Sequence, residues 1–369
     1  MKKHGHKFFL AAAQILLTLL LLCLSSCSGS RGPIAMQYED TTVTEGMYLY
    51  YMSHYKSVFI NNYSSVTDTA EFWASDLVEG MTAEEYFSEV IEENVKKNLA
   101  GAYLFDYMKL SFNSGMKDAV KDGIKDLCVT LCDGDYDKFD EMLAEYGLDR
   151  DILYDVYVMD AKVGYAHDYL YGDYGIIEIP DADKMIYLKE NYSHIQHIYI
   201  NNKYSYILDE NGNRTYEQET GKYYTQALTD EQQSAADAKI EAVRNGLEGG
   251  GDFDALWDEY SEDKLYDDGY YLLPETPFIS EIVTAAFELD IGEVTEIETE
   301  HGVHFIKRYD MEGSPWDDAG SKDFFEDFMT NLKDHSYTVM LGQTTESITV
   351  NRDIINKYKL SEVKPNRYV

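Results

Sequence analysis

The hydrophobic pattern of this chain changes near residue 191, and this change constrains the fold more than any other feature. Between residues 41 and 190 apolar side chains recur at helical spacing, as in "TEGMYLYYMSHYKSVFINN". From residue 191 short strand-like runs appear, beginning with "SHIQHIYI", and they alternate with helical segments. A period of 3.6 residues indicates amphipathic helices, whereas short apolar runs rich in Ile, Val and Tyr indicate strands. The sequence therefore predicts a helical region followed by a mixed region of strands and helices.

Two helices are predicted from N-terminal capping signals in the sequence. Thr82 and Glu85 open the long segment "TAEEYFSEVIEENVKKNLAGAYLFDYMKLSF", and Thr229 and Gln232 open a second helix that glycines end at 249–251. At this spacing a threonine hydroxyl and a Glu or Gln side chain each bond to the other residue's backbone N–H, which forms a capping box. We expect helices to begin at both places.

The mixed region contains one strong turn signal. The segment "YSYILDENGNRTYEQ" has Asn211-Gly212 between two apolar runs, which predicts a hairpin with a strand on each side. The order strand, hairpin, helices, strands predicts an α+β domain, with helices packed on a small antiparallel sheet. Residues 312–369 supply one more helix and a short strand. They have too few apolar residues for a separate core, so we expect them to pack on the N-terminal helices.

The N-terminus has the layout of an export signal. Three lysines lie within the first seven residues, and the apolar run "FFLAAAQILLTLLLLCL" precedes "LSSC" at residues 24–27. This ending resembles the bacterial lipobox. The resemblance implies a signal peptide over 1–26, attachment of palmitate-like acyl chains to Cys27, and anchoring at the extracytoplasmic face of the cell membrane. Residues 27–40 would then be a flexible tether. An ordinary secretory signal that contains a cysteine is the alternative.

The charge balance excludes one class of partner. The chain has 68 acidic and 31 basic residues, which gives a net charge of −37. A surface this acidic repels phosphate groups, so nucleic acid is not expected to bind. Cys128 and Cys132 lie four residues apart on a predicted helix, a geometry that favours free thiols over a disulfide.

Three segments, in this order, carry a family resemblance: "SHIQHIYI", "EGGGDFDALWDEYSED" and "AAFELDIGEVTEIETEHGVHFIKRYD". Together they resemble the parvulin-type peptidyl-prolyl cis-trans isomerases, with the domain over 191–311. A lipidated export signal, a helical region over 41–190, this central domain and a returning segment over 312–369 resemble the PrsA- and SurA-type extracytoplasmic foldases. The resemblance implies partners that are unfolded exported polypeptides with X-Pro bonds. It leaves open whether the chain forms a homodimer.

The parvulin resemblance implies a set of site residues. His197 and His304 match the paired histidines that lie on neighbouring strands, and Asp263 in "YSEDK" matches the position of the catalytic Cys or Asp. His301 stands where the family has a small polar residue. Three apolar residues match positions that line or adjoin the pocket for the proline ring: Phe278, Ile282 and Phe287.

Two departures from the family pattern bear on function. The family's "GGDLG" reads "DGYYL" here, with only Gly269 retained. No basic cluster is present to bind a phosphate, which favours clients that are not phosphorylated. The altered loop leaves two functions open: an isomerase that assists folding, or a holdase chaperone that keeps the scaffold without the activity.

Metal binding is a rival interpretation that the spacing disfavours. His194 and His197, like His301 and His304, are three residues apart, and on a strand such residues point to opposite faces. The acidic segment "DGDYDKFDEML" lacks the glycine and the bidentate glutamate of a calcium loop, so we interpret it as a solvated loop. No metal or other cofactor is predicted.

Overall fold

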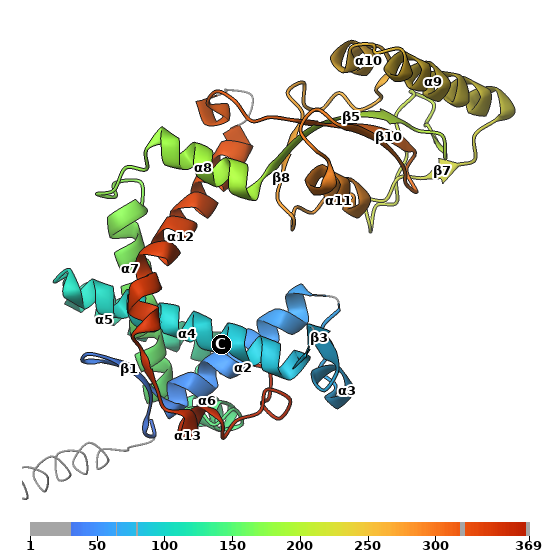
Figure 1. Ribbon diagram of the computed structural model, residues 1–369. Coiled ribbons are helices and arrows are strands. Elements are labelled where there is room, and N and C mark those ends of the chain that lie inside the picture. Colours follow the sequence, from blue (N-terminus) through green and yellow to red (C-terminus); the bar gives the residue numbers. More distant parts are fainter. Residues whose placement is uncertain (1–30, 64, 79, 318–321, 367–369) are drawn as a thin grey trace, which may run out of the picture. The chain divides into compact units, whose positions relative to one another are not determined.

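The computed structural model describes residues 31–63, 65–78, 80–317 and 322–366, and these residues divide into two units (Figure 1). The first unit combines the N-terminal part, up to residue 178, with residues 333–366. The second unit covers residues 179–332. Helices and small antiparallel sheets make up both units, so the predicted α+β class is confirmed.

The first unit is mainly helical. Its helices and strands are α2 (Glu45–Asn62), α3 (Ala70–Trp73), α4 (Ala83–Tyr107), α5 (Ser114–Cys132), α6 (Tyr136–Ala144), α7 (Arg150–Tyr171), the end of α12 (Lys322–Glu346), α13 (Arg352–Ile355), β1 (Ile34–Tyr38), β2 (Thr41–Thr44), β3 (Asp76–Val78), β4 (Met81–Thr82) and β11 (Thr349–Val350). The capping box of Thr82 and Glu85 is present at the start of α4. Cys128 and Cys132 on α5 are free thiols.

Strand β1 corrects part of the sequence prediction. Residues 34–38 lie in the segment predicted to be a flexible tether, yet they form the central strand of a sheet with the order β11-β1-β2. Ala35 and Met36 are fully buried. Because one partner strand, β11, comes from residues 349–350, no local pattern in the first forty residues could have indicated this pairing.

The C-terminal segment is held in the first unit by polar contacts. The Nζ atom of Lys56 donates to the carbonyl oxygen of Val363 at 2.7 Å, and the Ser53 hydroxyl donates to the carbonyl of Lys364 at 2.6 Å. Arg352 forms a two-bond ion pair with Glu92 on α4. These contacts join the C-terminal segment to α2 and α4, which lie roughly 300 residues before it in the sequence.

The second unit is built on a four-stranded antiparallel sheet with the order β8-β5-β10-β9. Its helices and strands are α8 (Asp181–Asn191), β5 (Ser193–Ile200), β6 (Ser205–Tyr206), β7 (Thr225–Gln226), α9 (Asp230–Glu248), α10 (Phe253–Tyr260), β8 (Tyr270–Leu272), α11 (Ser280–Glu288), β9 (Val294–Glu298), β10 (Val303–Tyr309), the 3-10 turn η1 (Pro315–Asp317) and the start of α12. The capping box of Thr229 and Gln232 is present at the start of α9.

Helices cover both faces of the two central strands (Figure 1). On one face Ile198 and Phe305 pack with residues of α9 and α10. On the other face Ile195 and Ile306 pack with residues of α11. A strand that is buried on both faces needs apolar residues at successive positions, which explains the runs of Ile, Val and Phe in β5 and β10.

A further apolar cluster extends this unit beyond the predicted range of 191–311. It joins α8 to the start of α12 and consists of Leu188, Tyr192, Met311, Trp316, Phe328 and Leu332. Trp316 stacks on Phe328 with ring centroids 5.8 Å apart. The unit therefore begins at residue 179 and includes the first turns of α12.

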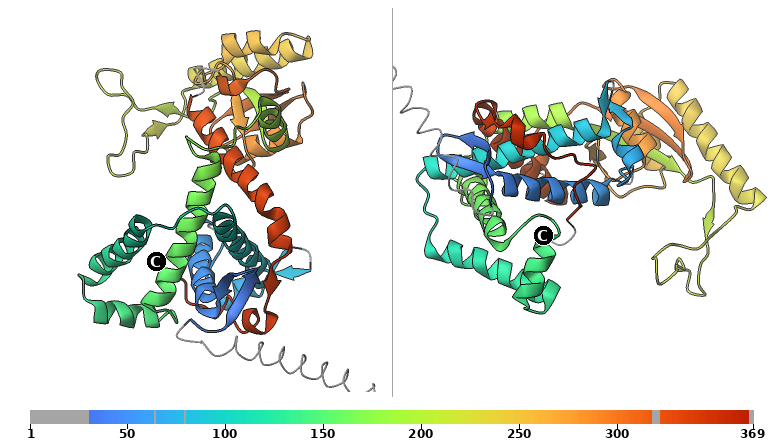
Figure 2. Two further views of the ribbon diagram at one scale, coloured as in Figure 1. Left: turned by 90° about the vertical axis from the view of Figure 1, so that its left-hand side faces the viewer. Right: turned by 90° about the horizontal axis from the view of Figure 1, so that it is seen from below.

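Residues 201–228, which we call the arm, lie between β5 and α9 and project from the second unit (Figure 2). The predicted turn is present: Gly212 has a φ of +83°, and the Asp209 carboxylate accepts backbone N–H groups of Asn211 and Asn213 at 2.8 Å each. The strand predicted on each side of this turn is formed only in part. Only β6 and β7 pair, together with two isolated bridges, Leu208–Arg214 and Tyr216–Tyr223.

The predicted signal peptide, 1–26, and Cys27 lie outside the described residues. Among the helices that the structure does describe, none combines the length and the apolar character needed to span a bilayer.

Candidate active site

The register between β5 and β10 brings two distant histidines together. His197 stands opposite Ile306, and His304 stands opposite Tyr199. In an antiparallel pair, residues offset by two positions lie diagonally on the same face of the sheet. The rings of His197 and His304 are therefore stacked, and their Nδ1 atoms lie 3.2 Å apart.

A chain of four side chains runs through this histidine pair. On one side the Nε2 atom of His197 lies 2.8 Å from Oδ2 of Asp263. On the other side the Nε2 atom of His304 lies 3.1 Å from the hydroxyl of Thr299. We call Thr299, His304, His197 and Asp263 the polar chain. The sequence analysis did not single out Thr299; its place between β9 and β10, near His304, was the available signal.

With both imidazoles taken as neutral tautomers, one arrangement of hydrogens satisfies every bond in the polar chain. An ionised Asp263 only accepts, so His197 donates from Nε2 and accepts at Nδ1. His304 must then donate from Nδ1 and accept at Nε2, where the Thr299 hydroxyl donates. Each ring nitrogen of the two histidines has one partner in this arrangement.

The carboxylate of Asp263 is held in its ionised form. Burial alone would raise its pKa, but hydrogen bonds from His197, Tyr270 and the backbone N–H of Leu265 outweigh burial and lower the pKa to about 2. The Tyr270 hydroxyl donates to Oδ2 at 2.6 Å, and the Leu265 N–H donates to Oδ1 at 3.0 Å. Asp263 therefore carries a negative charge throughout the physiological pH range.

His304 is held in its neutral form. It is almost fully buried beneath the sheet surface, and burial, followed by the nearby His197 and His301, lowers its pKa to about 4. Neutral His304 can both accept from Thr299 and donate to His197, as the polar chain requires.

Only one of the three predicted pocket residues lies at the polar chain. Phe278 contacts His197 edge-to-face, with ring centroids 6.0 Å apart. Ile282 is 0% exposed and packs in the core with Ile195 and Ile306, so as a pocket-lining residue it is corrected to an internal support. Phe287 is half-buried against the same core cluster.

Tyr270 takes a place beside Asp263 that the sequence analysis did not foresee. Besides donating to the carboxylate, its ring lies edge-on to His197 and 5.1 Å from the ring of Phe278. Gly269 makes this possible: its φ is +81°, and a Cβ there would come within 2.3 Å of the Ile195 carbonyl oxygen. The "DGYYL" loop thus keeps the one glycine that the backbone needs and places a phenol ring against the site.

The other two histidines lie outside the polar chain. The Nε2 atom of His194 lies 2.6 Å from the carbonyl oxygen of Asp268, and its ring stacks on Tyr271. His301 lies in the turn before β10, where its backbone N–H donates to Thr299. Within the described part of the chain, no group of three or more His, Cys, Asp or Glu residues is placed to hold a metal ion.

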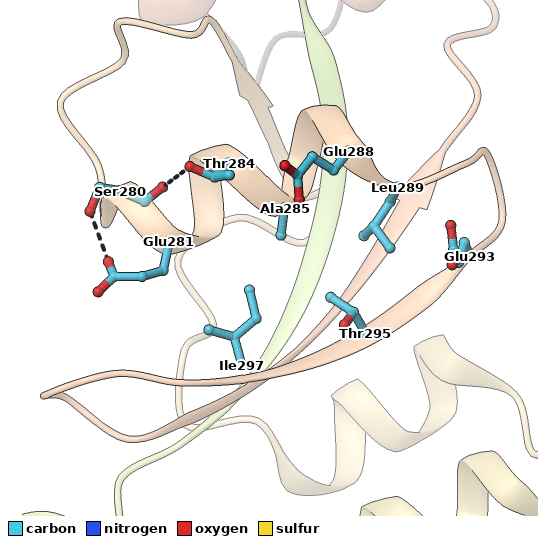
Figure 3. A pocket seen from close by; sticks show the side chains of 9 residues that line it. All are labelled: Ser280, Glu281, Thr284, Ala285, Glu288, Leu289, Glu293, Thr295 and Ile297. Atoms are coloured by element: carbon cyan, nitrogen blue, oxygen red, sulfur yellow. Dashed lines mark hydrogen bonds between the residues drawn. The ribbon is translucent and has the colours of Figure 1, made fainter.

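A surface pocket of about 560 Å³ lies next to α11 but is not the predicted proline pocket. Figure 3 shows Leu289 and Ile297 pointing into the space between α11 and β9, with carboxylates around them. The lining residues are Ser280, Glu281, Thr284, Ala285, Glu288, Leu289, Glu293, Thr295 and Ile297. None of them belongs to the polar chain, and Phe278 is not among them.

Comparison with known proteins identifies the second unit. Residues 222–310 match the model of the rotamase family described as PPIC-type PPIASE domain. The match begins inside the arm, so it includes Asp263 and His304 but not β5 with His197. The structure adds β5 to the same sheet through its pairing with β10. No curated protein matches the sequence.

Several solved structures are similar to the chain. PrsA from Bacillus subtilis has 18% identity and a TM-score of 0.23, with 72% of this chain and 88% of that chain covered. The peptidylprolyl isomerase PrsA from Bacillus anthracis has 17% identity and a TM-score of 0.23, covering 69% and 97%. The foldase protein PrsA from Streptococcus pneumoniae has 14% identity and a TM-score of 0.22, covering 76% and 96%.

The family match and the paired histidines on neighbouring strands are the informative findings. The chain therefore carries a PPIC-type peptidyl-prolyl cis-trans isomerase domain, that is, a parvulin domain.

Proposed function

We propose that the protein is a membrane-anchored extracytoplasmic foldase that isomerises X-Pro peptide bonds in exported polypeptides and assists their folding. The observation that carries the proposal is the polar chain, in which His197 bonds an ionised Asp263 and contacts the aromatic ring of Phe278. A parvulin domain surrounds this arrangement.

The reaction requires binding that favours a twisted amide. Rotation about an X-Pro bond crosses a barrier of about 18–20 kcal/mol, which amide resonance sets. Each 1.4 kcal/mol or so of preferential binding to the twisted form gives about a tenfold faster rate. Neither a covalent intermediate nor a metal ion is needed for this step.

Asp263 can supply such a preference. Amide resonance places negative charge on the carbonyl oxygen, and a carboxylate facing that oxygen disfavours this charge in the planar form. In the twisted form the resonance is lost, so the repulsion is weaker and the barrier is lowered. The polar chain fixes the position of the carboxylate, while an apolar contact with Phe278 would hold the proline ring.

The site favours clients without phosphate groups. Lys264 follows Asp263 directly, but its ammonium group donates to the carbonyl oxygens of Trp257 and Asp258 and lies over the Trp257 ring. It is therefore directed toward α10 and not toward a ligand at Asp263. Exported, unmodified X-Pro segments suit this charge distribution.

The proposed location depends on Cys27. The export signal and the "LSSC" ending motivate lipid attachment there. Cells grown with a palmitate analogue should label the native chain and not the Cys27→Ser variant, and a protease added outside intact cells should digest the native chain. Equal labelling of both chains would contradict lipidation at Cys27.

An isomerisation assay without a coupled protease tests the activity. We would use the mature chain from residue 27, made soluble by Cys27→Ser, with Ala-Pro and Glu-Pro peptides. We expect acceleration over buffer, and a loss of about tenfold or more in Asp263→Ala. A rate equal to buffer for the native site would contradict the isomerase proposal.

Tyr270 is the specific observation that favours the alternative, a holdase without isomerase activity. Its hydroxyl occupies one carboxylate oxygen of Asp263 and its ring packs against Phe278, so it stands where a proline-containing segment would bind. A holdase would slow the aggregation of an unfolded protein equally well with native Asp263 and with Asp263→Ala, while neither form isomerised a peptide.

A further inference from the structure

We propose that the arm is a second binding surface for the client polypeptide, and that it holds an extended, uncharged segment rich in proline, aliphatic and aromatic residues. This inference rests on the proposed function, because the segment would be continuous with the X-Pro bond at Asp263. Figure 2 shows the arm projecting from the second unit, where a flexible client could lie along it.

The arm exposes large apolar side chains that no core accounts for. It contains five tyrosines within 28 residues. Five of its large side chains are at least 39% exposed: Ile207, Leu208, Tyr216, Tyr223 and Tyr224. Single exposed apolar residues are common on protein surfaces, but a group of them on one projecting element is typical of a binding surface.

The tyrosine rings are arranged before any client binds. Tyr206 and Tyr223 lie edge-to-face with centroids 5.5 Å apart, and Tyr216 continues the series at 6.1 Å from Tyr223. The guanidinium group of Arg214 lies 4.0 Å from the Tyr206 ring centroid and 5.8 Å from that of Tyr223. Rings that are already held in place lose little conformational entropy on binding.

The aromatic series is continuous with the polar chain. The Tyr199 ring stacks on His304 at 4.9 Å, and burial together with the nearby Tyr204, at the start of the arm, raises the pKa of the Tyr199 hydroxyl. Tyr204 in turn lies 5.5 Å from Tyr206. A polypeptide that binds at the site and continues past Ile200 would therefore reach a row of tyrosine rings. Because the tyrosine rings of the arm continue from the polar chain, the segment bound by the arm would belong to the same client polypeptide.

The charge of the arm also fits an uncharged client segment. The arm has three basic residues against four acidic ones, whereas the whole chain has 31 against 68. An uncharged segment gains most from such a surface, because tyrosine faces pack on proline rings and aliphatic groups.

The structure suggests a clean way to remove the arm. Tyr206 and Thr225 are direct partners in the β6–β7 pair, so an Asn-Gly turn can join them in place of residues 207–224. We call this the closed-arm variant. A second variant, Tyr216→Ala with Tyr223→Ala, removes two exposed rings, and its matched control, Tyr216→Phe with Tyr223→Phe, keeps them.

The experiment compares short and long peptides on the soluble mature chain. The short probe is a tetrapeptide with one central proline, and the long probes extend it by ten uncharged apolar residues on either side. Fluorescence anisotropy measures the dissociation constants. We expect the closed-arm and double-alanine variants to bind one of the two long probes, the one whose extension reaches the arm, about tenfold more weakly than the native chain. The phenylalanine control should bind that probe with the native affinity, and all variants should isomerise the tetrapeptide at the native rate.

Two results would overturn the proposal. One is equal affinity of the native chain and the closed-arm variant for every long probe. The other is a change of the native chain from dimer to monomer on closing the arm, seen by sedimentation, with peptide affinity unchanged. The latter would assign the arm to a second copy of the chain. Failure of the isomerase proposal is distinguishable, because arm-dependent binding would persist without any catalysed isomerisation.

Discussion

The Nδ1 atoms of His197 and His304 lie 3.2 Å apart although 107 positions separate the two residues in the sequence. The His197 ring hydrogen-bonds to the Asp263 carboxylate and the His304 ring to the Thr299 hydroxyl, so the polar chain links these two end groups through the histidine pair.

His304 should make folding stability dependent on pH. The folded protein lowers the pKa of His304 from 6.5 to about 4, so below pH 6.5 the unfolded chain takes up a proton that the folded chain does not. Stability is therefore fully present above about pH 6.5 and falls as the pH drops toward 4, by up to about 3 kcal/mol. Urea unfolding at several pH values measures this slope.

The variants His304→Gln and Thr299→Val separate the histidine from its surroundings. His304→Gln removes the titrating group and should flatten the pH slope between 6.5 and 4. Thr299→Val keeps both histidines and should retain a slope of the same sign. Identical slopes for the native chain and His304→Gln would show that His304 does not carry the effect.

Tyr270 should limit access to Asp263. Tyr270→Leu removes both the hydroxyl that bonds the carboxylate and the ring that contacts Phe278. Because neither the hydrogen bond, of about 1 kcal/mol, nor the ring then competes with the client, we expect kcat/KM for an Ala-Pro peptide to rise more than about fivefold. Tyr270→Phe keeps the ring and should give a smaller rise. A fall in kcat/KM for Tyr270→Leu would instead show that Tyr270 helps to bind the client.

Gly269 should be indispensable for the loop that carries Tyr270. An alanine there would need a left-handed φ of +81° and would place Cβ 2.3 Å from a carbonyl oxygen. We expect Gly269→Ala to lower the free energy of unfolding by about 3 kcal/mol. Gly212→Ala is the matched control, since it has a similar φ but no neighbour within 4 Å, and should cost about 1 kcal/mol. Equal costs would contradict the close approach at Gly269.

Lys56 should stabilise the first unit. Its buried Nζ atom bonds the Val363 carbonyl and pairs with Asp68, both at 2.7 Å, near the ring of Trp73. Lys56→Met removes the donor to the buried Val363 carbonyl and leaves Asp68 with the Trp73 indole N–H, which donates at 2.9 Å. It should lower stability by about 2 kcal/mol, followed through tryptophan fluorescence. Lys162→Met, at a more exposed ion pair with Asp106, should cost less than about 1 kcal/mol. Equal losses of stability in Lys56→Met and Lys162→Met would contradict a larger stabilising contribution of the buried Lys56.

Much of the local structure could be predicted from the amino-acid sequence. Apolar residues at helical spacing predicted the helices of the first unit, and the capping boxes at Thr82 and Thr229 marked the starts of α4 and α9. Asn211-Gly212 marked the turn of the arm. These features depend on neighbouring residues alone, because caps and tight turns are closed by groups within four positions of each other.

Long-range packing determines which distant residues lie next to each other. The pairing of β1 with β11, the burial of Ile282 and the contact of Tyr270 with Asp263 join residues that no local pattern links. The resemblance to parvulins named His197, His304 and Asp263, but the register that places them in one chain of hydrogen bonds comes from packing on both faces of β5 and β10. A one-residue slip would turn either histidine to the opposite face, so the long-range core, and not the strand sequence, fixes the site.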